Sequence, residues 1–401
     1  MRILSVFILF FGLMSHFSTY AKHPVILISL DGFAQDYLSE YKTPNIHKMI
    51  DQGVMAEALL PVYPSKTFPN HLSIITGMYP IKHGIIHNRF YLDKIDETYK
   101  LGAGEHNSAW LTAEPIWAVA EKNHITTAVY FWPESTAKGQ QYPPTYNRPY
   151  NKNTPNLARI DQIIDWLKMP EDKRPQLIIS YFSLVDTAGH HFGRGSPQLK
   201  AAITEADNLI GVLLTRLAKE ISLPVDFILV SDHGMVQLTD RSIIPWQQYV
   251  PKNKQLKVVN GQTQLLIYSK DKKVLQQLEQ KFNAFSAGRF NVYYKNNFPK
   301  HWHWNVDISR LPDMVIEAKV PFVFQGKHDD TTVATHGYDI IGEADLNAIF
   351  IAYGPSFKAH KKMPAFENIN VASLILHLLA IKQPENIDGK LAIFQPYLTN
   401  R

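Results

Sequence analysis

The stretch P-V-I-L-I-S-L-D-G, residues 24–32, decides the fold class of this chain. An almost unbroken apolar run of this length is typical of a strand that is buried on both faces of a parallel sheet. Two further runs have the same character, from Leu177 to Val185 and from Val225 to Ser231, and we expect each to form a strand. Each of the three runs stops at an aspartate: Asp31, Asp186 and Asp232.

Helical periodicity lies between the second and third of these runs. Apolar residues recur at helical spacing from Gln198 to Leu217. Strands that alternate with helices indicate an α/β fold, with a mostly parallel central sheet flanked by helices. Ligands of such sheets gather beyond the carboxyl ends of the strands. The three aspartates are therefore expected to meet at one edge of the sheet, although each alone is typical of a loop residue or a helix cap.

Histidines accompany these aspartates at spacings that suit a metal ion. Asp186 and His190 lie four residues apart in D-T-A-G-H, so a helix that begins there would place both on one face. Asp232 and His233 are adjacent, and a turn at the next residue, a glycine, could aim both at one centre. His336 offers one more ligand after an irregular stretch. Carboxylates and imidazoles without thiolates suit zinc, and also manganese or iron.

A candidate nucleophile lies in P-S-K-T-F-P-N-H, residues 64–71. Pro69 suits the first turn of a helix that we expect to run to about Thr76 and to end at Gly77. A hydroxyl at Ser65 or Thr67 would stand at the start of that helix, where free backbone N–H groups bind phosphate oxygens. A plain helix cap is the structural alternative. A free hydroxyl is a weak nucleophile, and a coordinated metal would activate it by stabilising the alkoxide.

The ordered set of these motifs resembles the nucleotide pyrophosphatase/phosphodiesterase family, bacterial type, of the alkaline phosphatase superfamily. The resemblance covers residues 24 to about 355, and its pieces are V-I-L-I-S-L-D-G (25–32), Y-P-S-K-T-F-P-N-H (63–71), T-G-M-Y-P-I-K-H-G-I-I-H-N (76–88), D-T-A-G-H (186–190), S-D-H-G-M (231–235) and T-H-G-Y (335–338). The segments E-P-I-W (114–117) and F-W-P-E (131–134) also resemble bacterial members.

This resemblance implies a role for each matching residue. Thr67 matches the nucleophile, and Asn88 matches the side chain that helps to hold a phosphate oxygen. Aromatic rings at Phe68 and Tyr181 match those that lie against a nucleotide base. One zinc ion is implied at Asp31, Thr67, Asp232 and His233, and a second at Asp186, His190 and His336. The implied reaction is hydrolysis of phosphodiester or pyrophosphate bonds of nucleotides through a phosphothreonine, with the two ions ~3.5–4 Å apart.

Other readings of the same residues stay open. A phosphomonoesterase or a phosphonate hydrolase would share the metal ligands, and a non-catalytic exported binding protein would keep the pocket without the chemistry. A sulfatase is disfavoured, because its Cys-or-Ser-x-Pro-x-Arg signature is missing around Thr67. The family takes nucleotides, dinucleotides, nucleotide sugars and choline-type lipids, so the choice among these small-molecule substrates stays open, as does the oligomeric state.

The domain organisation is expected to be simple. Residues 22–401 are interpreted as one catalytic domain of the alkaline phosphatase-like type, with a small α+β subdomain inserted at about 246–324. Its clearest helix is expected from Lys272 to Phe282. Within it, H-W-H-W at 301–304 looks like a site, but without a matching motif we interpret it as a loop packed by aromatic rings.

The start of the chain predicts export. Residues 1–21 combine a charged Arg2, a short apolar run and small residues before position 22, which is the pattern of a signal peptide; an uncleaved anchor is the alternative. The run from Val371 to Ile381 is too short to span a bilayer and reads as a packed helix. The chain has no cysteine, which excludes disulfides. Its net charge of +5 is a mild basic bias, and aromatic residues are not interleaved with a Lys/Arg stripe, so binding of a nucleic-acid polymer has little support. We expect a periplasmic or secreted protein.

Overall fold

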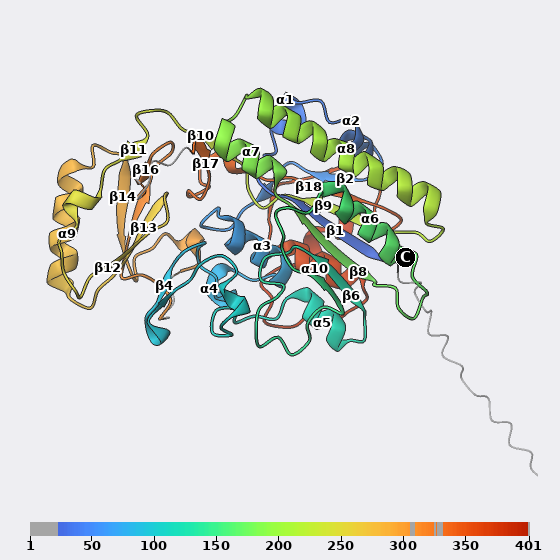
Figure 1. Ribbon diagram of the computed structural model, residues 1–401, viewed down its shortest axis with the longest axis horizontal. Helices are drawn as coiled ribbons and strands as arrows, with labels where there is room; N and C mark the ends of the chain where they lie inside the picture. The colour runs from blue at the N-terminus through green and yellow to red at the C-terminus, as the bar shows by residue number, and fades with distance from the viewer. Residues whose placement is uncertain (1–22, 305–308, 325, 327–331, 400–401) are drawn as a thin grey trace, which may run out of the picture.

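The computed structural model describes residues 23–304, 309–324, 326 and 332–399, and the predicted signal peptide at 1–21 lies outside them. A large sheet forms the centre of the molecule (Figure 1). Its strands, in spatial order, are β19 (Lys361–Met363), β2 (Val54–Ala56), β18 (Phe350–Tyr353), β9 (Asp226–Val230), β1 (Val25–Leu30), β8 (Leu177–Phe182), β6 (Thr127–Tyr130) and β7 (Tyr146–Arg148).

The sheet is mostly parallel, as predicted. Strands β9, β1, β8, β6 and β7 run parallel to one another, and β2 is parallel to β19. Strand β18 is antiparallel to both β9 and β2, so the sheet as a whole is mixed. All residues of β1, β8 and β9 are buried, which explains their continuous apolar sequences.

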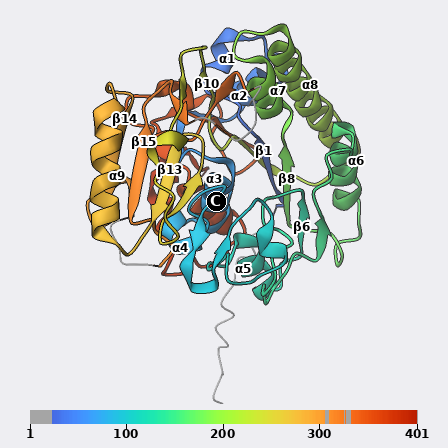
Figure 2. The same ribbon diagram turned by 60° about the vertical axis from the view of Figure 1, so that its left-hand side comes forward.

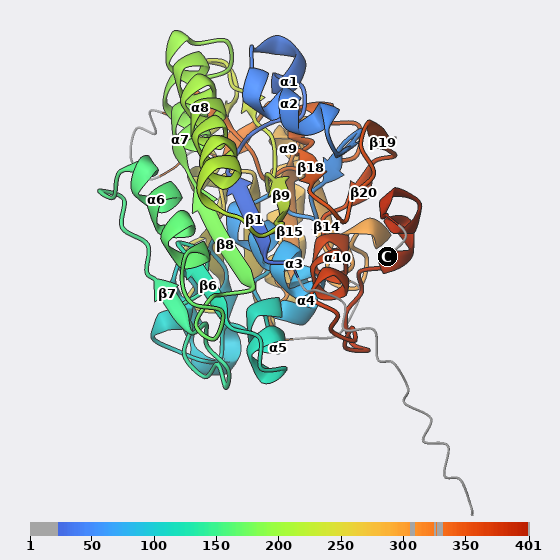
Figure 3. The same cartoon turned by 90° about the vertical axis from the view of Figure 1, so that its right-hand side faces the viewer.

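Two layers of helices cover the faces of this sheet (Figure 3). Helices α2 (Pro44–Asp51), α6 (Asn156–Leu167), α7 (Leu184–Phe192) and α8 (Pro197–Glu220) contact one another on one side. Helices α3 (Thr67–Thr76), α5 (Ile116–Lys122) and α10 (Asn370–Leu378) form the other layer. Short helices α1 (Tyr37–Glu40) and α4 (Pro80–His83) lie in connecting segments. Helix α10 is the packed helix expected near Val371.

The end of the second predicted strand is corrected by the structure. We expected a strand from Leu177 to Val185, but β8 ends at Phe182 and helix α7 begins at Leu184. Two apolar residues in the first turn of a buried helix cannot be told from the end of a buried strand by periodicity. The boundaries of α3 agree with the prediction: it ends at Thr76, and Gly77 follows in the left-handed region at φ +69°.

A second, four-stranded antiparallel sheet lies beside the first, with helix α9 (Lys272–Phe285) on its outer side and α3 toward the large sheet (Figure 2). Its strands are β12 (Lys257–Asn260), β13 (Gln264–Tyr268), β15 (Met314–Ala318) and β14 (Phe290–Tyr294). Residues of β13 alternate between two cores: Leu265 and Ile267 pack with α9, whereas Leu266 and Tyr268 pack with the main core. The division into a catalytic domain and an inserted subdomain stays a prediction.

The H-W-H-W segment packs as expected. The Trp302 ring stacks on Tyr63 with centroids 3.7 Å apart, and both Trp302 and Trp304 are buried. Short strand pairs complete the fold: β10 (Val236–Gln237) with β17 (Ala334–Thr335), β11 (Ile243–Ile244) with β16 (Val323–Phe324), β20 (Phe366–Glu367) with β3 (Leu59–Leu60), and β4 (Tyr91–Leu92) with β5 (Glu97–Thr98). Within the described part of the chain, no helix is long and apolar enough to cross a membrane.

Candidate metal centre and substrate cavity

The three predicted aspartates meet at the carboxyl edge of the large sheet. Strand β1 pairs with β8 on one side and with β9 on the other. Asp31 directly follows β1, and Asp232 lies two residues after the end of β9. Asp186 lies in the first turn of α7, two residues after that helix begins. Parallel strands of matched register therefore bring segments more than 150 residues apart in sequence to one place.

One group of metal-binding type gathers around His233. Its Nε2 atom lies 3.5 Å from Asp31 Oδ1 and 3.0 Å from Asp232 Oδ2. The ligand atoms of these three residues all lie within 4.8 Å of one another. The Thr67 hydroxyl reaches the same group, with its Oγ1 atom 3.3 Å from His233 Nε2. All four residues implied for the first ion thus converge.

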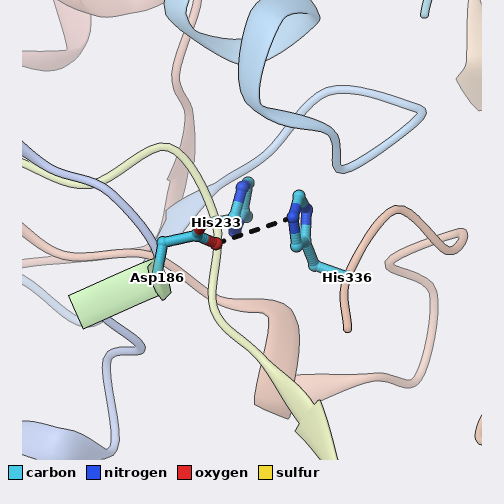
Figure 4. A group of neighbouring side chains, drawn as sticks. All are labelled: Asp186, His233 and His336. Carbon is cyan, nitrogen blue, oxygen red and sulfur yellow. Dashed lines mark ion pairs between the residues drawn. The ribbon is translucent and has the colours of Figure 1, made fainter. Parts of the chain in front are cut away.

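A second group shares His233 with the first. Asp186, His233 and His336 also have ligand atoms within 4.8 Å of one another, and Figure 4 shows them converging from three separate segments. His336 Nε2 lies 3.7 Å from Asp186 Oδ1, and His190 Nε2 lies 3.3 Å from the same oxygen. The resemblance implied His190 in this set and His233 in the first set alone. The geometry places His233 between the two groups.

The three histidines are held so that Nε2 faces the carboxylates. In each ring the other nitrogen, Nδ1, lies within hydrogen-bond distance of a backbone carbonyl and can donate to it, which fixes Nε2 as the unprotonated ligand atom of the neutral ring. The pairs are His190 with Ala334 O (2.8 Å), His233 with Gly234 O (2.9 Å) and His336 with Ser65 O (2.7 Å).

One oxygen of each aspartate at this edge lacks a hydrogen-bond partner in the part of the chain that the structure describes. Asp31 Oδ1, Asp186 Oδ1 and Asp232 Oδ2 are buried and have no hydrogen-bond partner among the described residues. Burying an ionised oxygen without a donor or a counter-charge is strongly unfavourable. A bound cation would remove this cost, and oxygen and nitrogen ligands without thiolates fit zinc, manganese or iron. The residues present therefore fit a metal centre.

The electrostatics of the cluster agree with that interpretation. Burial raises the pKa of Asp31 well above its ordinary value, and the negative charge of Asp186 raises it further. Burial also acts to raise the pKa of Asp232, but the neighbouring His233 holds it well below its usual range. Burial and the charge of His233 lower the pKa of His336 well below its ordinary value. A neutral imidazole is the form that binds metal ions.

The structure separates the two candidate nucleophiles. Thr67 is the first residue of α3 and is partly exposed. Ser65 is fully buried, and its hydroxyl donates to Tyr338 O (2.8 Å) and accepts from Gly337 N (3.0 Å). The Ser65 hydroxyl is therefore occupied in joining two loops, whereas the Thr67 hydroxyl faces the histidine cluster.

Asn88, which the resemblance assigned to holding a phosphate oxygen, lies beside the start of α3. Its Oδ1 atom accepts a hydrogen bond from the backbone N–H of Phe68 (2.9 Å). Because a backbone N–H can only donate, the accepting atom of Asn88 must be oxygen, and the amide nitrogen is left as the donor for a ligand. This arrangement suits a neutral donor to a phosphate oxygen.

A cavity of about 380 Å³ opens from this centre. Thr67, Asp31 and Asp186 line one end, and Phe68 and Tyr181 line its walls. Both aromatic residues that we predicted thus lie in one cavity. The Tyr181 ring is only 9% exposed, and its hydroxyl donates to Asp31 Oδ2 at 2.5 Å.

Three further residues at the site were missed by the sequence analysis. Tyr150 lines the same cavity and is 58% exposed, but its loop carried no motif that we recognised. His71 Nδ1 lies 3.2 Å from Asp232 Oδ2, and its position four residues after Thr67 on α3 was an available signal. Lys66 is buried and donates from Nζ to His336 O (2.8 Å), which only the tertiary structure reveals.

Comparisons with known proteins identify the family of this chain. A model of the type I phosphodiesterase/nucleotide pyrophosphatase family matches residues 25–339. An uncharacterized pyrophosphatase/phosphodiesterase of Schizosaccharomyces pombe is 33% identical over 387 residues, which cover 90% of this chain and 78% of that relative. A venom phosphodiesterase of Naja atra is 32% identical over 380 residues, which cover 91% of this chain and 45% of the venom protein. The chain thus spans less than half of that second relative.

Solved structures share the fold closely. A structure of an inactive threonine-to-alanine variant of murine ectonucleotide pyrophosphatase/phosphodiesterase 5, in complex with AMP, superimposes with a TM-score of 0.85. It is 28% identical, and the match covers 94% of this chain and 100% of that one. The predicted α/β architecture is confirmed by this match.

Proposed function

Because the chain belongs to the type I phosphodiesterase/nucleotide pyrophosphatase family, whose members hydrolyse phosphoester and anhydride bonds, we propose that it hydrolyses phosphodiester or pyrophosphate bonds of nucleotides. The observation that carries the proposal is the position of the Thr67 hydroxyl. It stands at the N-terminus of α3, 3.3 Å from His233 Nε2, at the end of a cavity lined by aromatic rings.

Two zinc ions are proposed as the cofactors. Asp31, Asp232 and His233, with Thr67, would hold one ion. Asp186, His190 and His336 would hold the other, with His233 between the two groups. When bound, the ions would supply positive charge that favours the ionised form of a hydroxyl and stabilises charge on phosphate oxygens.

Thr67 is proposed to attack phosphorus directly. Its Oγ1 forms a bond to phosphorus, the bond from phosphorus to the leaving oxygen breaks, and the hydroxyl proton passes to solvent. A water molecule then forms the new P–O bond, and the bond between phosphorus and Thr67 breaks, which restores the hydroxyl. The backbone N–H groups at the start of α3 and the Asn88 amide would hold the other phosphate oxygens through both steps.

The cavity is proposed to hold the nucleoside. Phe68 immediately follows the nucleophile, and Tyr150 is the more exposed of the other aromatic residues that line the cavity. Stacking on such rings accepts any base, because every base presents a flat face. The AMP complex of the murine relative supports a nucleotide ligand. We also infer export, to the periplasm or the medium, from the leader pattern at residues 1–21.

Substitution of Thr67 tests this function. We expect Thr67→Ala to lower turnover of a nitrophenyl nucleotide diester by at least about a thousandfold, which is roughly 4 kcal/mol of barrier. The metal content, measured by elemental analysis, should stay close to that of the wild type. Ser65→Ala should keep turnover once folded, because its hydroxyl serves only the loop contacts. An active Thr67→Ala variant beside an inactive, folded Ser65→Ala variant would make Ser65 the nucleophile. A preference of the wild type for phosphomonoesters would show that the protein is a phosphatase and not a diesterase.

A further inference from the structure

A second and larger groove adjoins the nucleoside cavity. It has a volume of about 830 Å³, compared with about 380 Å³ for the cavity, and Tyr150 lines both. The groove lies between the segment that leads into α6 and the helices α7 and α8. Volumes of this size accommodate a small organic ligand. Tyr150 is thus a shared wall with space on both sides.

The groove and the metal groups share helix α7. Helix α7 carries Asp186 and His190 on one face, toward the metal groups. Ser183 and Thr187, also four residues apart, line the groove. Because each residue turns a helix by about 100°, the side chain of Thr187 projects to the side of Asp186. A leaving group that extends along this side of α7 would meet the two hydroxyl residues of the groove.

The lining of the groove has the features of a site for an organic anion. Two strongly exposed rings face it, Tyr150 at 58% and Phe192 at 51% exposure. Its charged residues are Lys152, Arg159 and Glu205. Two cations and one carboxylate give the groove a net positive lining.

Of the two cationic side chains in the groove, Arg159 is the stronger evidence for an anionic ligand. It is only 5% exposed, and its guanidinium lies over the rings of Phe131 and Phe182 at 5.0 and 4.5 Å from their centroids. One terminal nitrogen donates to Tyr181 O (3.0 Å), whereas Nε is buried and has no hydrogen-bond partner within the described ranges. Among the described residues, no carboxylate lies within ion-pair distance of it. A buried cation without a counter-ion favours an anionic ligand.

We propose that this groove is the subsite for the leaving group, and that it takes a leaving group with both a phosphate and an organic head. The inference rests on the proposed function, because it assigns the second half of the same substrate. The nucleoside that stays with Thr67 lies on one side of Tyr150, and the departing organic phosphate lies on the other. Substrates with organic groups at both ends of the phosphate chain would then be favoured.

Three substrates with the same nucleoside half test the subsite. They are a nitrophenyl nucleotide, a nucleoside triphosphate and a dinucleoside tetraphosphate, which differ only in the leaving group. We expect Phe192→Ala to lower kcat/KM for the dinucleoside tetraphosphate roughly 5- to 150-fold, the range of a lost base stack, and to leave the nitrophenyl nucleotide almost unchanged. Lys152→Ala should raise KM for both phosphate-bearing leaving groups, with a smaller effect at high salt.

Two matched control variants complete this test. Ile341→Ala removes a side chain that is 66% exposed and lies outside the groove, and Lys173→Ala removes an exposed lysine outside it. Neither control should move any of the three values. Equal losses on all three substrates with Phe192→Ala, or no loss on the dinucleoside tetraphosphate, would overturn the subsite.

The subsite and the proposed chemistry can fail separately. If the metal-loaded wild type cleaves none of the three substrates, the proposed function is wrong. The groove is then judged by binding: Thr67→Ala should bind the dinucleoside tetraphosphate more tightly than the double variant Thr67→Ala/Phe192→Ala by a similar factor of roughly 5 to 150 in Kd. Equal affinities would exclude the groove as a site for that ligand.

Discussion

Two groups of buried acids, one at the edge of the large sheet and one on the second sheet, differ in what surrounds their oxygens. At the edge of the large sheet, Asp31, Asp186 and Asp232 each have one buried oxygen that finds no hydrogen-bond partner in the described part of the chain. On the second sheet, Glu317 of β15 is equally buried, but Tyr63 donates to its Oε2 (2.6 Å) and Gln264 to its Oε1 (3.1 Å).

The comparison shows that burial of an acid does not by itself indicate a metal ion. Glu317 is stabilised by donors from the protein, and a third one, the backbone N–H of Asp339, lies 3.2 Å from Oε1. The aspartates face imidazole Nε2 atoms that can accept but not donate when Nδ1 carries the proton. The cluster therefore has acceptors in excess, which an external cation would balance. The balance of donors and acceptors separates a structural cluster from a candidate metal centre.

Substitution of one acid in each cluster should separate them most strongly. We expect Asp232→Asn to lose bound metal and essentially all turnover, because it removes a carboxylate charge that faces His233 and His71. We expect Glu317→Gln to keep its metal and most of its turnover, because its oxygens contact no member of the histidine cluster at ion-pair distance. Elemental analysis of both purified variants, with turnover of a nitrophenyl diester, gives the measurement.

Chelation supplies the matching control on the wild type. Exhaustive chelation should remove activity, and added zinc should restore it to the wild type and to Glu317→Gln. Full activity in a sample from which elemental analysis finds no metal would contradict the metal centre. Loss of metal from Glu317→Gln, despite a folded protein, would contradict the distinction between the clusters.

Aromatic residues of the two regions should differ in the same way. Phe68 and Tyr150 line an open cavity, whereas Tyr63 and Trp302 stack in a buried contact. We expect Phe68→Ala to lower kcat/KM for a nucleotide diester roughly 5- to 150-fold, because stacking on a base is worth ~1–3 kcal/mol. A diester without a base should lose far less. Tyr63→Phe should leave both substrates close to wild type and affect stability instead.

The contrast between Tyr150 and Tyr181 sharpens this prediction. If the exposed ring carries the base, Tyr150→Ala should resemble Phe68→Ala on both substrates. Tyr181→Phe should act differently, because it removes a hydrogen bond to Asp31 and keeps the ring. Equal losses on substrates with and without a base after Phe68→Ala would show that the ring supports the centre and does not bind a nucleoside.

Much of the fold could be predicted because the decisive strands are buried on both faces. Continuous apolar runs identified β1, β8 and β9, and each pointed to the aspartate that follows it. The sequence could not fix where β8 ends, because Leu184 and Val185 suit either a strand or a buried helix. It also could not show that β18 runs antiparallel, since strand direction depends on the path of the connecting chain.

The candidate site could be predicted as a set of residues but not as a geometry. The motifs identified Thr67 and six acids and histidines, but not His71. The position of His233 between the two groups depends on how three segments converge. Tyr150 was missed because it lies in a loop without regular spacing. Ser65 could be separated from Thr67 only by its hydrogen bonds, which join parts of the chain more than 270 residues apart.

The smallest expected difference between the two groups of acids is in how the free energy of unfolding depends on pH. Burial raises the pKa of Glu317 from its ordinary value of 4.5 to about 8. The folded protein therefore keeps a proton between these values that the unfolded chain has lost. Stability from this group is complete below pH 4.5 and is lost as the pH rises to about 8, with a slope of at most about 1.4 kcal/mol per pH unit.

Neighbouring Lys66 acts in a separate pH range. Burial lowers its pKa from 10.5 to about 8, so its contribution changes above pH 8 and has the opposite sign, with stability rising as the pH increases. Urea unfolding of metal-saturated wild type and Glu317→Gln at several pH values from 5.5 to about 8 therefore isolates the glutamate. We expect the free energy of unfolding of the wild type to fall relative to that of the variant across this range. Parallel curves for the two proteins would mean that Glu317 is ionised in the folded state, and its cluster would then hold a buried charge as the aspartates do.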